Sequence, residues 1–236
     1  MCHQVLVHPP GGLVGGDTLD LHITLNAESC ALITTPGAAR FYRSEGEWAE
    51  QHVQARLEKG ARLEWLPLET LAYRQCKGRN RMSFSLAPGS QMIGWDVLAL
   101  GLPAAGQTFD QGQFHQHLEL PGEWLERGLI DGRDERLLSS PLGFGGHGVL
   151  ATMWLAQGHE LRRERREELL ELARTQVTQN SGNVVAGVTS PRSGLVVLRV
   201  LGHRVEPVMT LLQAVWTVWR RAHWGLEPCP PRIWKM

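Results

Sequence analysis

The segment LEKGA at residues 57–61 is the middle one of three related segments that set the architecture of this chain. Its counterparts are LNAES at 25–29 and LAPGS at 86–90, so the segments recur at offsets of 32 and 29 residues. A recurrence of this length is typical of stacked β units, each made of a strand, a tight turn and a second strand. Because no helical pattern separates the units, stacked sheets or an irregular β-solenoid fit better than a parallel βαβ fold.

Alternating apolar and polar side chains extend this interpretation over most of residues 17–136. Residues 19–25 place an apolar side chain at every second position, which is the pattern of a half-buried strand. The same alternation returns at 53–57 and at 82–86. This part of the chain is therefore predicted to consist mainly of strands.

Helical patterns come late in the sequence. Residues 159–174 combine spaced leucines with a mixed run of Arg and Glu, which predicts an amphipathic helix. Residues 206–223 carry a broader apolar stripe, with Pro207 near the start and Gly225 just after the end, where a helix favours them. Between these two helices, residues 195–201 are predicted to form a strand.

We therefore predict a mainly β protein, with a body of stacked sheets or an irregular β-solenoid and two C-terminal α-helices. The whole chain, 1–236, is expected to form a single domain. Its parts are a β-rich region at 1–136, a glycine-rich loop at 137–150 and a mixed strand and helix region at 151–236.

Composition excludes several classes of protein. The 24 Lys and Arg residues balance 24 Asp and Glu residues, so no basic surface for nucleic acid or anionic membrane is expected. No apolar run approaches the roughly 20 residues of a membrane-spanning helix, and no secretory signal is apparent. The four cysteines are scattered, which suits a reducing compartment. A cytoplasmic location is expected.

Sequence patterns give little support to catalysis. A Gly-x-Ser-x-Gly motif is absent, and the glycine-rich stretch at 8–17 lacks the Lys-Ser/Thr of a phosphate-binding loop. His115 and His117 would share one face of a strand, but no further ligand follows at a recognisable spacing. We predict no enzyme activity and no tight metal site, with these two histidines as weak candidates.

Three acidic residues are more informative. Asp96 interrupts an apolar strand, Glu126 lies among large apolar residues, and Asp17 opens a strand. An unpaired carboxylate is costly to bury, so each must be exposed, paired or hydrated. One interpretation is that Glu126 pairs with an arginine and Asp96 caps a turn. The other is that these acids line a hydrated internal passage.

Four motifs resemble those of the urease accessory proteins called UreD or UreH. The first is HPPGGLVGGD at 8–17, and the second is TTPGAARFYRS at 34–44, with LEWLP at 63–67 and PRIW at 231–234 completing the set in the family's order. The residues that match the first two motifs are His8, Pro9, Pro10, Gly11, Gly12, Gly15, Gly16, Asp17, Thr35, Pro36, Gly37, Arg40, Phe41, Tyr42 and Arg43.

The sequence also departs from the family. Arg40 stands where lysine is usual, Leu102 replaces an arginine, and Gln107 replaces a common glutamate. Members of the family usually carry several dozen residues before the position at which this sequence starts. Relative to the family the sequence is therefore short at its N-terminus, either because the member is naturally short or because its start is placed late.

The resemblance implies a non-enzymatic chaperone that joins a UreF-type accessory protein, and through it a UreG-type GTPase, to apo-urease. Nickel would pass transiently through an internal water-filled channel, with Asp17, Asp96 and Glu126 at positions similar to acids that line it. No tightly bound cofactor, nucleic acid or membrane is expected as a partner. Carboxylates and water suit such a path, because imidazole and thiolate clusters hold Ni²⁺ more tightly.

Two other functions stay open from the residues alone. A β-solenoid enzyme acting on a polysaccharide could use Asp96 and Glu126 as an acid pair, which would require a cleft open to solvent. A purely structural adaptor would need no passage for metal at all.

Overall fold

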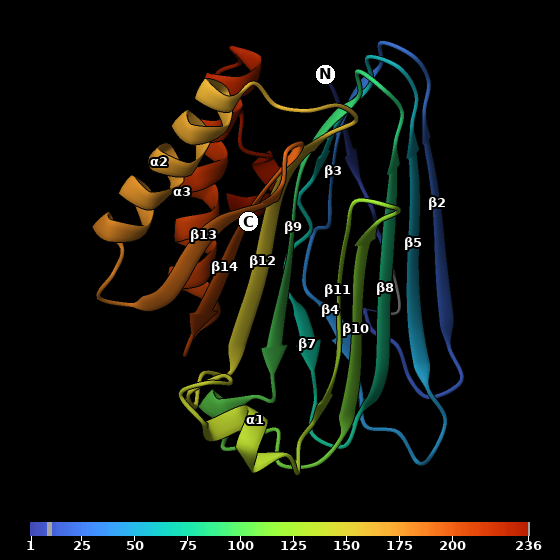
Figure 1. Cartoon of the computed structure of the whole chain (residues 1–236). Coiled ribbons are helices and arrows are strands. Elements are labelled where there is room, and N and C mark those ends of the chain that lie inside the picture. Colours follow the sequence, from blue (N-terminus) through green and yellow to red (C-terminus); the bar gives the residue numbers. More distant parts are fainter. Residues whose placement is uncertain (9–10, 236) are drawn as a thin grey trace.

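The computed structural model describes residues 1–8 and 11–235, which form three layers (Figure 1). A five-stranded sheet faces a nine-stranded sheet, and two long helices cover the other face of the larger sheet. The prediction of a mainly β protein with stacked sheets and two C-terminal helices is confirmed.

The smaller sheet has the strand order β11-β10-β8-β5-β2. Its strands are β2 (Thr18–Leu25), β5 (Ala49–Leu57), β8 (Lys77–Leu86), β10 (Gln113–Leu120) and β11 (Trp124–Asp131). The larger sheet has the order β1-β3-β6-β9-β12-β14-β13, and β7 joins β4 to β9. Its strands are β1 (Cys2–Val5), β3 (Cys30–Thr34), β4 (Ala39–Phe41), β6 (Arg62–Trp65), β7 (Thr70–Ala72), β9 (Gln91–Leu100), β12 (Val149–Gln157), β13 (Val184–Arg192) and β14 (Leu195–Gly202).

The sequence recurrence corresponds to the parallel register of the sheets. Leu25 lies beside Leu57, and Leu57 lies beside Leu86, so the sequence offsets equal the offsets between paired residues. Each unit sends its first strand to the smaller sheet and its second strand to the larger one: β2 and β3, β5 and β6, β8 and β9. Gly60 (φ 71°) and Gly89 (φ 85°) form the turns through the left-handed region, and Glu28 (φ 60°) takes the same conformation in the first unit.

Helices α2 (Arg163–Gln179) and α3 (Val205–Trp224) pack side by side on the larger sheet (Figure 1). Helix α3 ends at Gly225 (φ 64°), as its sequence predicts. Helix α2 begins and ends later than the predicted range 159–174. Its last turn is mostly polar, with Val177 as the one apolar residue, and Thr175 and Thr178 donate hydrogen bonds to backbone carbonyls of the preceding turn, so the apolar pattern marks its end poorly.

The glycine-rich segment at 137–150 is not a loop throughout. Helix α1 (Glu135–Ser139) runs into it, and β12 already begins at Val149. Asp134 starts α1 as its N-cap by accepting a hydrogen bond from the backbone N–H of Leu137 at 3.0 Å. Short 3₁₀ helices occur at η1 (Pro103–Ala105) and η2 (Arg232–Lys235). No helix in the described part of the chain is long and apolar enough to cross a membrane.

Candidate functional site between the two sheets

A band of polar side chains crosses the space between the two sheets. On the smaller sheet, Gln51, Asn80 and Gln116 are lateral neighbours on β5, β8 and β10. On the larger sheet, Asp96, Thr152 and Arg199 are lateral neighbours on β9, β12 and β14. We call these six residues, together with Glu126 of β11, the polar row.

The polar row separates two apolar clusters. Met82, Phe84 and Trp154 belong to the cluster on one side of it, and Leu98 and Phe114 belong to the cluster on the other side. Each strand therefore places one polar residue in an otherwise apolar, inward-facing series. A buried row of this kind must satisfy its own hydrogen bonds or hold water, because unpaired polar groups are costly between apolar layers.

Asp96 lies at the centre of the row and is only 7% exposed. Its carboxylate accepts a hydrogen bond from Asn80 Nδ2 at 3.2 Å, and Gln116 Nε2 donates to its other oxygen. Burial raises the pKa of Asp96 to about 7, although the two amide hydrogen bonds oppose this increase. The interpretation that Asp96 caps a turn is wrong, since the residue lies in the interior of β9 and faces the opposite sheet.

Glu126 links the smaller sheet to strands β12 and β14 of the larger one. Its Oε1 accepts a hydrogen bond from Thr152 Oγ1 at 2.7 Å, and its Oε2 accepts one from Arg199 Nε at 2.7 Å. The expected pairing of Glu126 with an arginine is therefore confirmed. The charge of Glu126 also contributes to the raised pKa of Asp96.

Two cavities meet at Asp96. The first has a volume of about 430 Å³ and is also lined by His8, Arg40 and Gln51. The second has a volume of about 560 Å³, and its polar lining includes Gln116, Glu126, Thr152 and Arg199. Asp96 is thus the lining residue that the two cavities share among those described.

The two longest sequence motifs form one structural unit at the first cavity. Leu13 N donates to Arg40 O at 2.7 Å, and Tyr42 N donates to Leu13 O at 3.0 Å, so a single parallel bridge joins the first motif to the second. Gly12 permits this approach, since a Cβ there would lie 2.3 Å from the Tyr42 ring. Arg40 Nη1 also donates to Gly11 O at 3.3 Å.

The remaining motif residues divide between the cavity and the surface. Thr35, Pro36 and Gly37 line the first cavity, whereas Phe41 is buried with its ring edge-on to Phe114 at a centroid distance of 5.1 Å. Gly15 and Gly16 lie against Ser44 and Glu47, and Arg43 forms an exposed ion pair with Glu45 at 3.7 Å. Pro9 and Pro10 lie outside the described residues.

Asp17 lies apart from the polar row. It is exposed immediately before β2, where its carboxylate accepts a hydrogen bond from Val14 N at 3.0 Å. The structure thus brings Asp96 and Glu126 together and leaves Asp17 at the surface.

Comparison with known proteins shows the family of this chain. The family model described as UreD urease accessory protein matches residues 1–235. The chain belongs to the UreD family. The protein named urease accessory protein UreD from Variovorax paradoxus (strain S110) is 57% identical over 234 residues, covering 99% of this chain and 85% of its own. Its namesake from Leptothrix cholodnii (strain ATCC 51168 / LMG 8142 / SP-6) is 56% identical over 235 residues, covering 100% and 84%.

The histidines predicted as weak metal candidates in this UreD-family chain lie on the outer face of the smaller sheet. The His115 ring packs on Trp48 at a centroid distance of 5.0 Å, and burial together with the charge of Arg79 lowers the pKa of His115. His117 Nε2 lies 3.1 Å from Glu119 Oε2. Among residues 1–8 and 11–235, no three His, Cys, Asp or Glu side chains are placed to hold a metal ion together.

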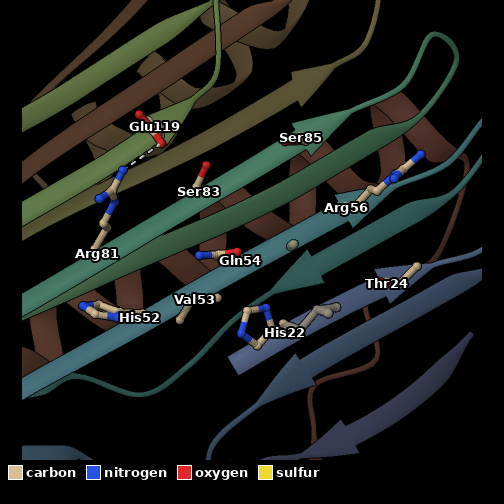
Figure 2. Close-up of a pocket in the computed structure, with 12 residues that line it drawn as sticks. His22, Thr24, His52, Val53, Gln54, Arg56, Arg81, Ser83, Ser85 and Glu119 are labelled. Atoms are coloured by element: carbon tan, nitrogen blue, oxygen red, sulfur yellow. Dashed lines mark ion pairs between the residues drawn. The ribbon is translucent and has the colours of Figure 1, made fainter. Parts of the chain in front are cut away.

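Figure 2 shows a shallow hollow on the same outer face, about 400 Å³ in volume, to which four neighbouring strands contribute. Arg81 forms an ion pair with Glu119 at 3.8 Å, and the two ring nitrogens of His52 lie 2.9 Å from Asp20 and 3.0 Å from Glu50.

Sequence reasoning missed five members of the polar row: Gln51, Asn80, Gln116, Thr152 and Arg199. A signal for one of them is present, because the apolar alternation at Met82 and Phe84 predicts an inward position for Asn80. The role of the others depends on which strands lie opposite one another.

Proposed function

We propose that this chain is a non-enzymatic chaperone of urease maturation that guides nickel through the space between its two sheets. The observation that carries the proposal is that Asp96 lines both cavities, with Glu126 following in the second. Membership of the UreD family supplies the link to urease.

The chemistry of the polar row suits transient passage of a divalent cation. Carboxylate, amide and hydroxyl oxygens form an oxygen-rich path, and such ligands release Ni²⁺ more readily than several imidazoles or thiolates do. At a k_on of about 10⁶ M⁻¹s⁻¹, a nanomolar site would hold its metal for roughly 10³ s, which is too slow for a conduit. Sparse oxygen ligands avoid this trap.

We also propose the partners that the family implies. The chain would bind apo-urease and a UreF-type accessory protein in the cytoplasm, and the UreF-type protein would recruit a UreG-type GTPase. Nickel is the cargo of this assembly rather than a resident cofactor of the chain.

The alternative of a polysaccharide-cleaving enzyme has less support. An acid pair that cleaves glycosides must face a sugar in an accessible cleft, with the carboxyl groups about 5–10 Å apart. Asp96 is buried between the sheets, and both oxygens of Glu126 are already engaged by Thr152 and Arg199.

The test compares D96N, E126Q and the double variant in cells that lack their own UreD but contain the cognate urease and other accessory proteins. We expect the nickel content and activity of urease to fall, most in the double variant, while the UreF-type protein still co-purifies with the chain. D17N tests separately whether Asp17 contributes, since this residue lies at the surface and apart from the polar row. Full nickel loading by the double variant would exclude the passage and favour a purely structural adaptor.

A further inference from the structure

The Glu126 carboxylate is already occupied by a cationic side chain. Arg199 Nε donates to Glu126 Oε2 at 2.7 Å, and Arg199 Nη2 lies 2.5 Å from the same oxygen. The guanidinium stays protonated at any physiological pH, so it is a permanent positive charge. A second cation can bind Glu126 strongly only after this contact is broken.

Arg199 is placed at the outer end of the path. The Asp96 residue is 7% exposed, whereas the side chains of Glu126 and Arg199 are 29% and 50% exposed. Exposure thus increases from the centre of the polar row toward the mouth of the second cavity. Arg199 is therefore the most exposed of these three residues and is accessible from the mouth of the second cavity.

Arg199 has a second neighbour, the Trp124 ring, which its guanidinium can still contact after it leaves Glu126. The Arg199 guanidinium carbon lies 6.0 Å from the centroid of the Trp124 ring, at the limit of a cation–π contact. Trp124 begins β11, the strand that carries Glu126. A change of side-chain rotamer can weaken the contact with Glu126 while the guanidinium keeps the indole and water as neighbours.

We propose that Arg199 is a resident counter-ion that occupies the cation position at Glu126 and yields it to a divalent cation at the mouth of the second cavity. The role of this exchange in nickel delivery rests on the proposed function above, whereas the exchange itself is a property of the isolated chain. Arg199 thereby acts as a positioning residue that keeps Glu126 neutralised until a cation of higher charge arrives.

The experiment measures binding of Ni²⁺ alone to the purified full chain by titration calorimetry and equilibrium dialysis at neutral pH and low ionic strength. We expect R199Q to bind Ni²⁺ about tenfold more tightly than the natural chain, since a charged hydrogen-bonded competitor is removed. In R199Q/E126Q this gain should disappear. R56Q removes an exposed arginine of the outer face that forms no ion pair among the described residues, so it frees no carboxylate, and it should bind Ni²⁺ as the natural chain does.

R199M provides a second test that keeps the apolar stem of the side chain, and thermal unfolding identifies any variant that fails to fold. The proposal is overturned if folded R199Q and R199M bind Ni²⁺ no better than the natural chain, or if the gain persists without Glu126. Failure of the urease test with D96N and E126Q would instead reject the passage and leave cation exchange at Glu126 measurable.

Discussion

Glu64 of β6 and Arg220 of α3 form an ion pair that is buried between the larger sheet and the helix layer, with Arg220 Nε 2.9 Å from Glu64 Oε1. Trp216 Nε1 donates to the same oxygen at 2.7 Å, and burial raises the pKa of Glu64. The other oxygen, Oε2, finds no hydrogen-bond partner among the described residues. The Glu64 carboxylate needs a cation from the helix layer, and Arg220 supplies it. The ion pair therefore holds α3 on the larger sheet.

Replacement of Arg220 by methionine should therefore be strongly destabilising. Breaking a buried pair leaves an uncompensated carboxylate, and we expect the free energy of unfolding to fall by about 3–5 kcal/mol. Urea unfolding of R220M measures this loss. The double variant E64Q/R220M should recover part of it, because the orphaned charge is gone. A loss below about 1 kcal/mol in R220M would show that the pair contributes no more than a surface ion pair.

Gly12 offers a test of the junction between the two longest motifs. In G12A the new Cβ would lie 2.3 Å from the Tyr42 ring and 2.9 Å from the Arg40 carbonyl oxygen, so the two motif segments must move apart. We expect a loss of about 1–3 kcal/mol, as for other overpacked sites. G37A is the matched control, because a Cβ at Gly37 meets nothing within 4 Å. Thermal unfolding of both variants gives the comparison, and equal stability of the two would contradict the close approach.

Glu28 holds a left-handed conformation that its counterparts Gly60 and Gly89 adopt without strain. We expect E28G to raise the free energy of unfolding by about 0.5–1 kcal/mol, since strain at a non-glycine residue is relieved. E28A keeps the Cβ and should bring no such gain. Chemical denaturation measures the free energy of unfolding of both variants. If it rises as much in E28A as in E28G, the effect comes from the lost carboxylate and not from relief of backbone strain.

The buried carboxyl of Asp96 should make stability depend on pH. Its pKa in the folded chain is raised from 3.8 to about 7, so the folded state holds the proton more tightly than the unfolded state does. Its contribution to stability is complete below about pH 4 and is lost as the pH rises through about 7. D96N carries no titrating group at this position. Its stability relative to the natural chain should increase between pH 5 and pH 8, and a constant difference across this window would show that Asp96 does not titrate there.

The sequence predicted the parts of this fold that depend on local repetition. The offsets of 32 and 29 residues are the register of parallel strands, and the period-2 alternation identified the strands themselves. The C-terminal end of α2 was misplaced because its last turn is mostly polar, with side-chain hydrogen bonds from Thr175 and Thr178 to the preceding turn. Local sequence carries little information about such an end.

The site was predicted only in part for a different reason. Asp96 and Glu126 are acidic residues among large apolar neighbours, so each can be singled out from its own strand alone. Arg199 belongs to a strand 73 residues beyond Glu126, and nothing near either residue in the sequence relates the two. Asp17 shares a motif with residues of the first cavity, yet the turn at Val14 directs it to the surface. Membership of a motif therefore predicts the neighbourhood of a residue better than the direction of its side chain.

The recurrence of strand, turn and strand has a consequence for how the molecule assembles. The first strand of each unit pairs with its equivalent about one unit away along the chain, so a completed unit presents a template for the next. When strands are added one unit at a time, each new pairing closes a loop of only about one unit. In sandwiches whose paired strands are distant in sequence, each pairing must close a longer loop. We expect this chain to begin ordering before its helices have been synthesised, with the helix layer closing over a sheet that is already in place.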